Sequence, residues 1–185
     1  DILCTSRNAV QVVNSIPRDR TILFLPDRNL GKYVKRMTGR QNMNIWQGTC
    51  IVHATFTSRR LAAARLEHPE AAVAAHPECP EDVLEQADFV GSTSAIVDWC
   101  AASRARDFIV LTESGIARSL RLRAPGKRFV FVPNEECNCS ECPYMKRNTL
   151  EKLRDCLREL EPRVEIPAET ARRALVPLER MLALR

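Results

Sequence analysis

The feature that most constrains the fold is an order of strand, turn and helix patterns that occurs more than once along the chain. Apolar segments of strand length lie at residues 1–5 and 21–25, and similar segments open the stretches 87–100 and 107–122. Each is followed by small or acidic turn residues and then by an amphipathic helix pattern. Strands that alternate with helices predict a parallel sheet covered by helices, so we expect an α/β protein built from three-layer α/β/α sandwich units.

Two parts of this pattern align with each other at a separation of about 90 residues, which indicates an internal repeat. The equivalent positions are Asp1 and Asp88, Thr5-Ser6 and Ser92-Thr93, and Cys50 and Cys142. The repeat predicts an incomplete unit at residues 1–53, a complete unit at 54–145 and a helical tail at 146–185. In the tail, Asn148 followed by Glu151 predicts a capping box at the start of the first helix.

Charge and hydropathy exclude some classes of partner. The net charge of +5 is the balance of 28 basic and 23 acidic residues that are interspersed, and aromatic residues make up only 5% of the chain. A nucleic-acid surface usually combines clustered basic residues with aromatic ones, so we expect no nucleic-acid partner, while small anions fit. No apolar run approaches the roughly 18 residues of a membrane span, and no signal peptide is recognisable. We expect a cytoplasmic protein without a membrane partner.

Three of the eight cysteines fall within the stretch CNCSECPYM, at Cys137, Cys139 and Cys142. Without export, reduced thiols and metal ligands are favoured over disulfides. Zinc is disfavoured because structural zinc sites usually pair two cysteine knuckles and no second knuckle exists. An iron–sulfur cluster is favoured because proline often follows a ligating cysteine, as Pro143 follows Cys142. Loop thiols without any metal remain the alternative.

Seven short motifs carry a resemblance to a known family. They are CTSRNAV, PDRNLGKYV, GTCIVHATF, HPECP, STSAIV, TESGI and CPYMKRNTLEKL, in this order. The chain resembles quinolinate synthase, the iron–sulfur enzyme family of bacterial NAD biosynthesis, over essentially its whole length. The resemblance implies three α/β/α units around a pseudo-threefold axis, each giving one cysteine to a [4Fe–4S] cluster whose fourth iron stays open for substrate.

The resemblance implies that Cys50 and Cys142 are cluster ligands, with Cys137 and Cys139 as secondary candidates. The third cysteine has no counterpart here, because the repeat places it upstream of residue 1. The chain also begins without methionine, directly on an expected strand. We therefore expect a fragment that contains the last two of three units and is inactive alone, with a tail that packs on the other units in the intact enzyme.

The reaction implied by the resemblance condenses iminoaspartate with dihydroxyacetone phosphate to give quinolinate, phosphate and two waters. L-aspartate oxidase is the implied supplier of iminoaspartate. An open iron site can act as a Lewis acid on a bound hydroxyl, carbonyl or carboxylate. An aconitase-like hydratase with the same open-iron chemistry, and a noncatalytic metal-binding scaffold, are the alternatives.

Three residues are candidates for the catalytic chemistry. His53 follows Cys50 by three positions, so a turn or helix would place both side chains toward one pocket. His76 and Glu78 come directly after an apolar strand, where parallel sheets carry their sites. The resemblance places both in the active site, with Glu78 as general acid/base and His76 orienting the substrate.

Hydroxyl residues at strand-to-helix turns are candidates for substrate binding. Ser6, Ser92 and Thr93 stand where free backbone N–H groups favour a phosphate or carboxylate, although hydroxyl residues also cap helices at such positions. The resemblance makes them substrate contacts. Asp27 and Glu113 occupy equivalent turns, and for these two we expect a structural role, which is the commoner one for turn carboxylates.

Overall fold

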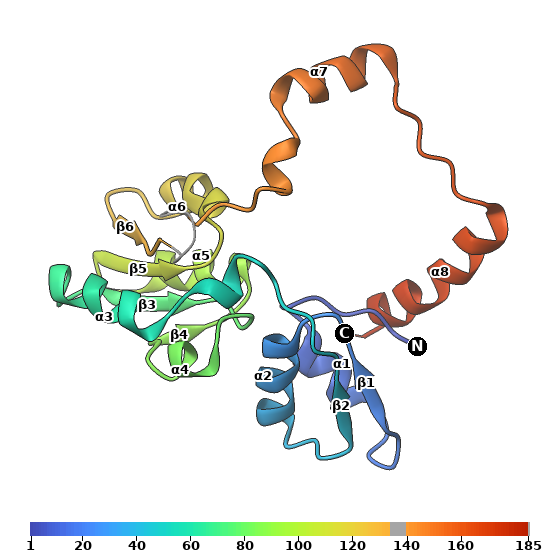
Figure 1. Cartoon of the computed structure of the whole chain (residues 1–185), viewed down its shortest axis with the longest axis horizontal. Coiled ribbons are helices and arrows are strands. Elements are labelled where there is room, and N and C mark those ends of the chain that lie inside the picture. Colours follow the sequence, from blue (N-terminus) through green and yellow to red (C-terminus); the bar gives the residue numbers. More distant parts are fainter. Residues whose placement is uncertain (134–139, 185) are drawn as a thin grey trace.

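The computed structural model describes residues 1–133 and 140–184, and it shows helices and parallel strands that alternate along most of the chain (Figure 1). The strands are β1 (Ile22–Phe24), β2 (Met43–Ile45), β3 (Ala72–Ala75), β4 (Phe89–Val90), β5 (Asp107–Leu111) and β6 (Arg128–Phe131). The α-helices are α1 (Ala9–Ser15), α2 (Arg28–Thr38), α3 (Ser58–Glu67), α4 (Glu81–Leu84), α5 (Thr93–Ala102), α6 (Ala117–Arg123), α7 (Leu150–Glu159) and α8 (Ala168–Leu182). Three short 3₁₀ helices are η1 (His53–Thr55), η2 (Ser114–Ile116) and η3 (Met145–Arg147).

The larger sheet belongs to the central unit, which we define as residues 54–145. Its four strands are all parallel and follow the order β4-β3-β5-β6. Successive residues of β3 face opposite sides, so fully buried Val73 packs with α3 and α4 while fully buried Ala74 packs with α5 and α6. Helices therefore cover both faces, and the expected three-layer α/β/α sandwich is confirmed.

The N-terminal unit, residues 1–53, has a two-stranded parallel sheet of β1 and β2. Ile22 and Phe24 of β1 pack with α1 and α2, whereas Leu23 between them points the other way and remains 64% exposed. Within the described residues, helices thus cover only one face of this sheet. This unit therefore has two layers, a sheet and one layer of helices, where the central unit has three.

The strand expected at residues 1–5 is absent, so that prediction is wrong. In the central unit the equivalent strand, β4, pairs only with β3. No described segment of the N-terminal unit stands where β3 stands, so residues 1–5 have no strand to pair with. They lie along α8 instead, where Leu3 N donates to Pro177 O at 3.1 Å and Arg180 Nη1 donates to Asp1 O at 2.9 Å.

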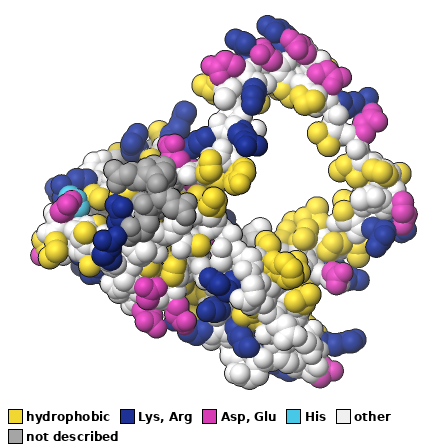
Figure 2. All heavy atoms as spheres, in the orientation of Figure 1, with side chains coloured by type: hydrophobic (Ala, Val, Ile, Leu, Met, Phe, Trp, Pro, Cys, Tyr) yellow, Lys and Arg dark blue, Asp and Glu magenta, His cyan; other side chains and the backbone are white. Residues whose placement is uncertain are grey.

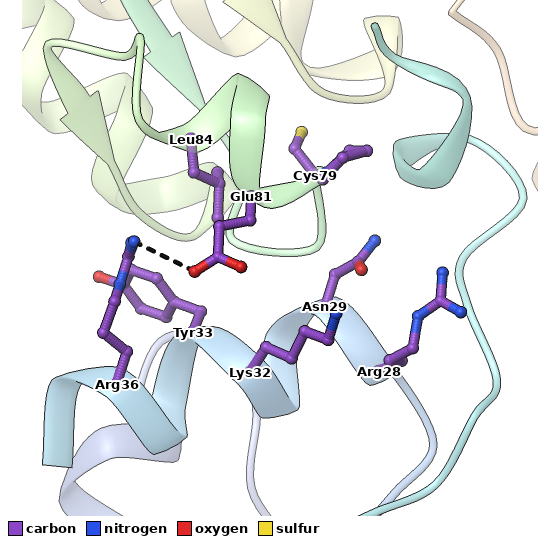
Figure 3. Close-up of a pocket in the computed structure, with 9 residues that line it drawn as sticks. Arg28, Asn29, Lys32, Tyr33, Arg36, Cys79, Glu81 and Leu84 are labelled. Atoms are coloured by element: carbon purple, nitrogen blue, oxygen red, sulfur yellow. Dashed lines mark ion pairs between the residues drawn. The ribbon is translucent and has the colours of Figure 1, made fainter. Parts of the chain in front are cut away.

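The two units meet where α2 faces α4 (Figure 3). Asn29 Nδ2 donates to the backbone carbonyl of Glu78 at 2.9 Å, and Arg36 forms an ion pair with Glu81 at 3.6 Å. A cavity of about 160 Å³ lies between the two helices, with Arg28, Lys32 and Arg36 along its α2 side. The contact with Glu78 ties the N-terminal unit to the segment that follows β3.

The tail leaves the central unit as an arc in which α7 makes no close approach to either sheet (Figure 1). Hydrophobic side chains follow the inner edge of the arc and charged ones the outer edge (Figure 2). The apolar face of α7 is exposed, with Leu150 at 81% and Leu157 at 69%. Its N-cap is Thr149, whose side chain accepts from Lys152 N, so the cap expected at Asn148 is one residue too early. None of the helices in the described residues is both long and apolar enough to cross a membrane.

A buried arginine holds the N-terminal unit together. Arg40 is only 2% exposed, and its guanidinium donates to Asn42 Oδ1 and to the backbone carbonyls of Ile16, Pro17 and Arg20 at 2.6–2.8 Å. These carbonyls belong to the loop between α1 and β1. The planar fork of an arginine offers five N–H donors on three nitrogens, whereas lysine offers three donors on a single nitrogen and cannot match all four contacts.

Replacing this arginine tests the fold of the N-terminal unit. Arg40→Lys leaves buried carbonyls without donors, so we expect a loss of about 3 kcal/mol in the free energy of unfolding. Arg36→Lys, at the exposed ion pair with Glu81, is the matched control and should change it by less than about 1 kcal/mol. Urea unfolding followed by circular dichroism measures both, and equal midpoints for the two variants would contradict this role of Arg40.

Candidate metal centre and active site

The candidate site lies at the carboxyl ends of the parallel strands. Cys50 and His53 come from the loop and 3₁₀ turn after β2, and Ala54 N donates to Cys50 O at 3.0 Å to close that turn. His76 and Glu78 directly follow β3, and Thr112 directly follows β5. β3 and β5 are neighbouring parallel strands, so His76, Glu78 and Thr112 meet at one edge of the larger sheet. The loop after β2, which belongs to the other sheet, brings Cys50 and His53 to this edge.

His53 is the centre of the hydrogen-bonding network. Its Nδ1 lies 2.9 Å from Glu78 Oε2 and 3.2 Å from Cys50 Sγ, and its Nε2 lies 2.9 Å from Thr112 Oγ1. The ring of His76 stacks on that of His53 with centroids 4.3 Å apart. His76 Nδ1 is 3.8 Å from Glu78 Oε2. The structure thus brings together the predicted residues His53, His76 and Glu78 beside Cys50.

The two stacked histidines have opposite pKa shifts. Burial lowers the pKa of His53, but hydrogen bonds and charges from Cys50 and Glu78 outweigh it and raise this pKa to about 9. For His76, burial and the nearby charge of His53 lower the pKa to about 4. At neutral pH the pair therefore carries one positive charge, on His53, whose Nδ1–H can donate to Glu78.

The acidic partners of His53 respond in the complementary way. Burial raises the pKa of the Cys50 thiol and of the Glu78 carboxyl, but the hydrogen bonds with His53 outweigh burial and hold both below their ordinary values. Cys79 Sγ donates to Leu111 O at 3.4 Å, and burial raises the pKa of this thiol strongly. The site favours a thiolate at Cys50, which is the form that binds metals.

Cys50 Sγ, a ring nitrogen of His53 and a carboxylate oxygen of Glu78 lie within 4.8 Å of one another, so these three side chains could hold a metal ion. Cys142 is not in this group of three. Its side chain is partly buried and packs against the same hydrophobic cluster as Cys50. Cys137 and Cys139 lie outside the described residues.

The candidate substrate-binding residues are more scattered. Ser92 is buried at the N-cap of α5 and its hydroxyl accepts from Ala95 N at 3.3 Å, so it performs the capping role that was the alternative. Thr93 is exposed beside it. Ser6 precedes α1 without capping it, because the N-cap there is Asn8. Substrate contact by these three stays a prediction.

Thr112 is the site residue that the sequence did not reveal. It is fully buried, and its hydroxyl fixes the far side of the His53 ring. The signal available was its position, since it directly follows an apolar strand, as His76 does after β3. A lone threonine after a strand is too common to single out without the contact.

Fold and site together define an α/β protein with a candidate metal centre at its strand ends. The sequence model of the family described as NadA, Quinolinate synthetase A protein, matches residues 1–183. The chain belongs to this quinolinate synthase family, which confirms the resemblance noted in the sequence.

Relatives in cyanobacteria carry the same name. Proteins named quinolinate synthase from Synechococcus sp., Synechocystis sp. and Prochlorococcus marinus are 50%, 48% and 47% identical to the chain over its whole length. The chain spans 58%, 58% and 56% of the lengths of these proteins. It therefore corresponds to somewhat more than half of the enzymes that it resembles.

The depressed pKa of His76 predicts a pH dependence of stability. Between pH 6.5, the ordinary value, and about 4, the unfolded chain binds a proton at His76 that the folded protein does not. Folding stability should thus fall as the pH falls through this range, by on the order of 3 kcal/mol from this residue. His76→Gln removes the effect and should flatten the urea-unfolding free energy between pH 6.5 and 4.

His68→Gln, at a histidine outside the site, corrects for the general cost of replacing a histidine. If the unfolding free energy of His76→Gln depends on pH as steeply as that of the wild type, the folded protein binds a proton at His76 as readily as the unfolded chain does. The assignment of a single positive charge to the stacked pair is then wrong.

Proposed function

We propose that this chain acts as part of a quinolinate synthase that condenses iminoaspartate with dihydroxyacetone phosphate to quinolinate, phosphate and two waters on a [4Fe–4S] cluster. The observation that carries the proposal is the convergence of Cys50, His53 and Glu78 within 4.8 Å at the strand ends of a chain of this family. L-aspartate oxidase is the proposed source of iminoaspartate.

The donor set fits an iron–sulfur cluster. Iron–sulfur clusters take thiolate ligands, and the pKa of Cys50 is held below its ordinary value while its side chain remains only partly buried. Cys142, the repeat equivalent of Cys50, borders the same apolar cluster. We assign these two cysteines as ligands and expect the third thiolate from outside this chain. A cluster with three protein ligands supplies an iron with an open position that serves as a Lewis acid.

Glu78 is the general acid/base of the proposed mechanism. Its side chain is 21% exposed, against 9% for His53 and 6% for His76, so it is the group of the three that a substrate reaches most easily. The condensation removes protons from carbon and nitrogen and protonates leaving hydroxyl groups, and a carboxylate that exchanges a proton with a neighbouring histidine can serve both steps.

The histidines hold this carboxylate and the substrate in place. His53 is fixed by Thr112 on one side and donates toward Glu78 on the other, so it can return a proton to the carboxylate. His76 is held neutral and stacked, and its ring presents a hydrogen-bonding nitrogen without a charge. Ser6, Ser92 and Thr93 are proposed to contact the anionic groups of the substrates.

A zinc-binding module is the second candidate. One cysteine, one histidine and one carboxylate within 4.8 Å are a ligand set that zinc also accepts. Metal analysis after anaerobic preparation separates the two candidates: iron with acid-labile sulfide supports the synthase, and one zinc per chain without sulfide supports the module.

Single cysteine replacements in the intact protein test the ligand assignment. Cys50→Ser and Cys142→Ser should abolish stable cluster assembly, because serine replaces a thiolate ligand by a weak one. Cys137→Ser, Cys139→Ser and the control Cys156→Ser should retain iron and sulfide. Iron and sulfide content, measured anaerobically, decides this. Retention in Cys142→Ser together with loss in Cys137→Ser or Cys139→Ser would move the ligand to the neighbouring cysteines.

Replacing Glu78 tests the acid/base role. Glu78→Gln keeps the shape and a hydrogen bond to His53 but cannot exchange a proton, so turnover should fall by about 10²- to 10⁴-fold with the cluster retained. Glu81→Gln, at the exposed ion pair with Arg36, is the control and should keep normal turnover. Quinolinate formation by the reconstituted intact enzyme is the measurement, and near-normal turnover of Glu78→Gln excludes Glu78 as the acid/base.

A further inference from the structure

Asp27 connects the start of a helix to the backbone of a cysteine. One carboxylate oxygen, Oδ1, accepts from Leu30 N at 2.7 Å and so caps α2. The other, Oδ2, accepts from Cys50 N at 2.8 Å, across 23 positions of sequence. Asp27 is only 5% exposed. Both oxygens are therefore occupied by backbone N–H groups from two different segments.

Glu113 makes the same pair of contacts in the central unit. Its Oε2 accepts from Gly115 N at 2.7 Å at the start of η2, and its Oε1 accepts from Cys142 N at 3.3 Å, across 29 positions. It is 8% exposed. Lys146 lies 3.2 Å from the same Oε1 and so ties the segment after Cys142 to this carboxylate as well.

The two arrangements are equivalent in the repeat. Asp27 lies close after β1 and Glu113 close after β5. Asp27 accepts from the amide of Cys50 and Glu113 from that of Cys142, and the repeat aligns these two cysteines with each other. Helix capping explains one oxygen of each carboxylate but not the second. Because a long-range hydrogen bond to a cysteine amide occurs in both units, we infer that the second oxygen of each carboxylate serves to position the cysteine.

The segment before Cys50 is also fitted closely to the turn that carries Asp27. Arg28 N donates to Gly48 O at 2.7 Å. A Cβ atom at Gly48 would lie 2.6 Å from Pro26 O, which is closer than such atoms approach. The main chain at Cys50 is thus held against the end of β1 by packing as well as by the carboxylate.

We propose that Asp27 and Glu113 are positioning residues that fix the main chain at Cys50 and Cys142, so that both thiolates point to one shared cluster. This rests on the proposed function, in which these two cysteines are the ligands. Holding the backbone N–H of a cysteine restricts the main-chain motion that would displace its Sγ, so a site fixed in this way needs less rearrangement to bind the cluster. Groups that orient metal ligands without touching the metal typically contribute about 10- to 100-fold in metal affinity.

The test uses variants that separate capping from positioning. Asp27→Asn keeps an oxygen for the helix cap, and asparagine is as good an N-cap as aspartate. Its amide NH₂ cannot accept from Cys50 N, so the second bond is lost. Glu113→Gln does the same at Cys142. The matched control is Asp88→Asn, because Asp88 Oδ2 accepts from Val73 N at 2.7 Å, which is a carboxylate–backbone bond of the same kind without a cysteine.

The first measurement needs no cluster. In the metal-free intact protein, hydrogen exchange at the Cys50 amide should be at least about 10-fold faster in Asp27→Asn than in the wild type or in Asp88→Asn, since a hydrogen bond that protects it is gone. Glu113→Gln should have the same effect at Cys142. Unchanged exchange at both cysteines overturns the proposal.

The second measurement follows the rate at which an iron chelator removes iron from the anaerobically reconstituted protein. Asp27→Asn and Glu113→Gln should release iron about 10- to 100-fold faster than the wild type, while Asp88→Asn releases it at the wild-type rate. If the wild type assembles the cluster but Asp27→Asn and Glu113→Gln lose iron no faster than Asp88→Asn, the positioning role is wrong and the proposed function stands. A wild type that assembles no iron and sulfide overturns the proposed function, and with it the purpose assigned to both carboxylates.

Discussion

The hydrogen bond between His53 Nδ1 and Glu78 Oε2, 2.9 Å long and largely shielded from water, is the interaction on which the candidate site depends. It joins the end of the N-terminal unit to the segment after the first strand of the central unit. A charge-assisted bond of this kind contributes more than a neutral one, about 1.5–3 kcal/mol. The turn that begins at Cys50 already holds His53 next to the thiol, so this bond adds the carboxylate and sets the relative position of all three groups.

The electrostatics of the site follow from that bond. Glu78 and Cys50 raise the pKa of His53, while burial and the charged His53 ring at 4.3 Å lower the pKa of His76. Two chemically identical side chains are thereby given different roles, one as a proton donor and one as a neutral hydrogen-bonding ring. Groups whose pKa values are driven apart in this way are typical of acid–base sites.

Much of the fold could be predicted because its signals are local. The apolar runs that became β1, β3, β5 and β6 are bounded by turn residues, and their order with helices is enough for a parallel three-layer sheet. The place of His76 and Glu78 at the carboxyl edge of the larger sheet was also predictable, because parallel sheets carry their sites there. Their contact with His53, which follows a strand of the other sheet, is not predicted by that rule. Residues 1–5 have the composition of a strand, but a strand exists only with a partner, and the pattern of the segment itself does not report one.

The contacts that were not predicted are long-range and polar. From the sequence, Arg40 is expected to be a surface residue in a loop. In the structure it is one of the most buried of the described residues, and its guanidinium donates to three backbone carbonyls of another loop. Thr112 differs from other threonines only through its contact with His53. Asp27 and Glu113 were expected to be structural from their turns, and the helix-capping half of their role agrees with that; the bond to a cysteine amide is visible only in three dimensions.

In the proposed function, cysteines from two successive units, Cys50 and Cys142, bind one iron–sulfur cluster beside Glu78. Anomalous diffraction at the iron absorption edge, from anaerobically grown crystals of the intact protein, locates the iron atoms and so tests this assignment. We expect a single cluster of iron peaks within bonding distance of both Sγ atoms, with an iron that no protein side chain ligates facing Glu78. Iron bound by only one of these cysteines, or a lone metal ion held by Cys50, His53 and Glu78, would contradict it.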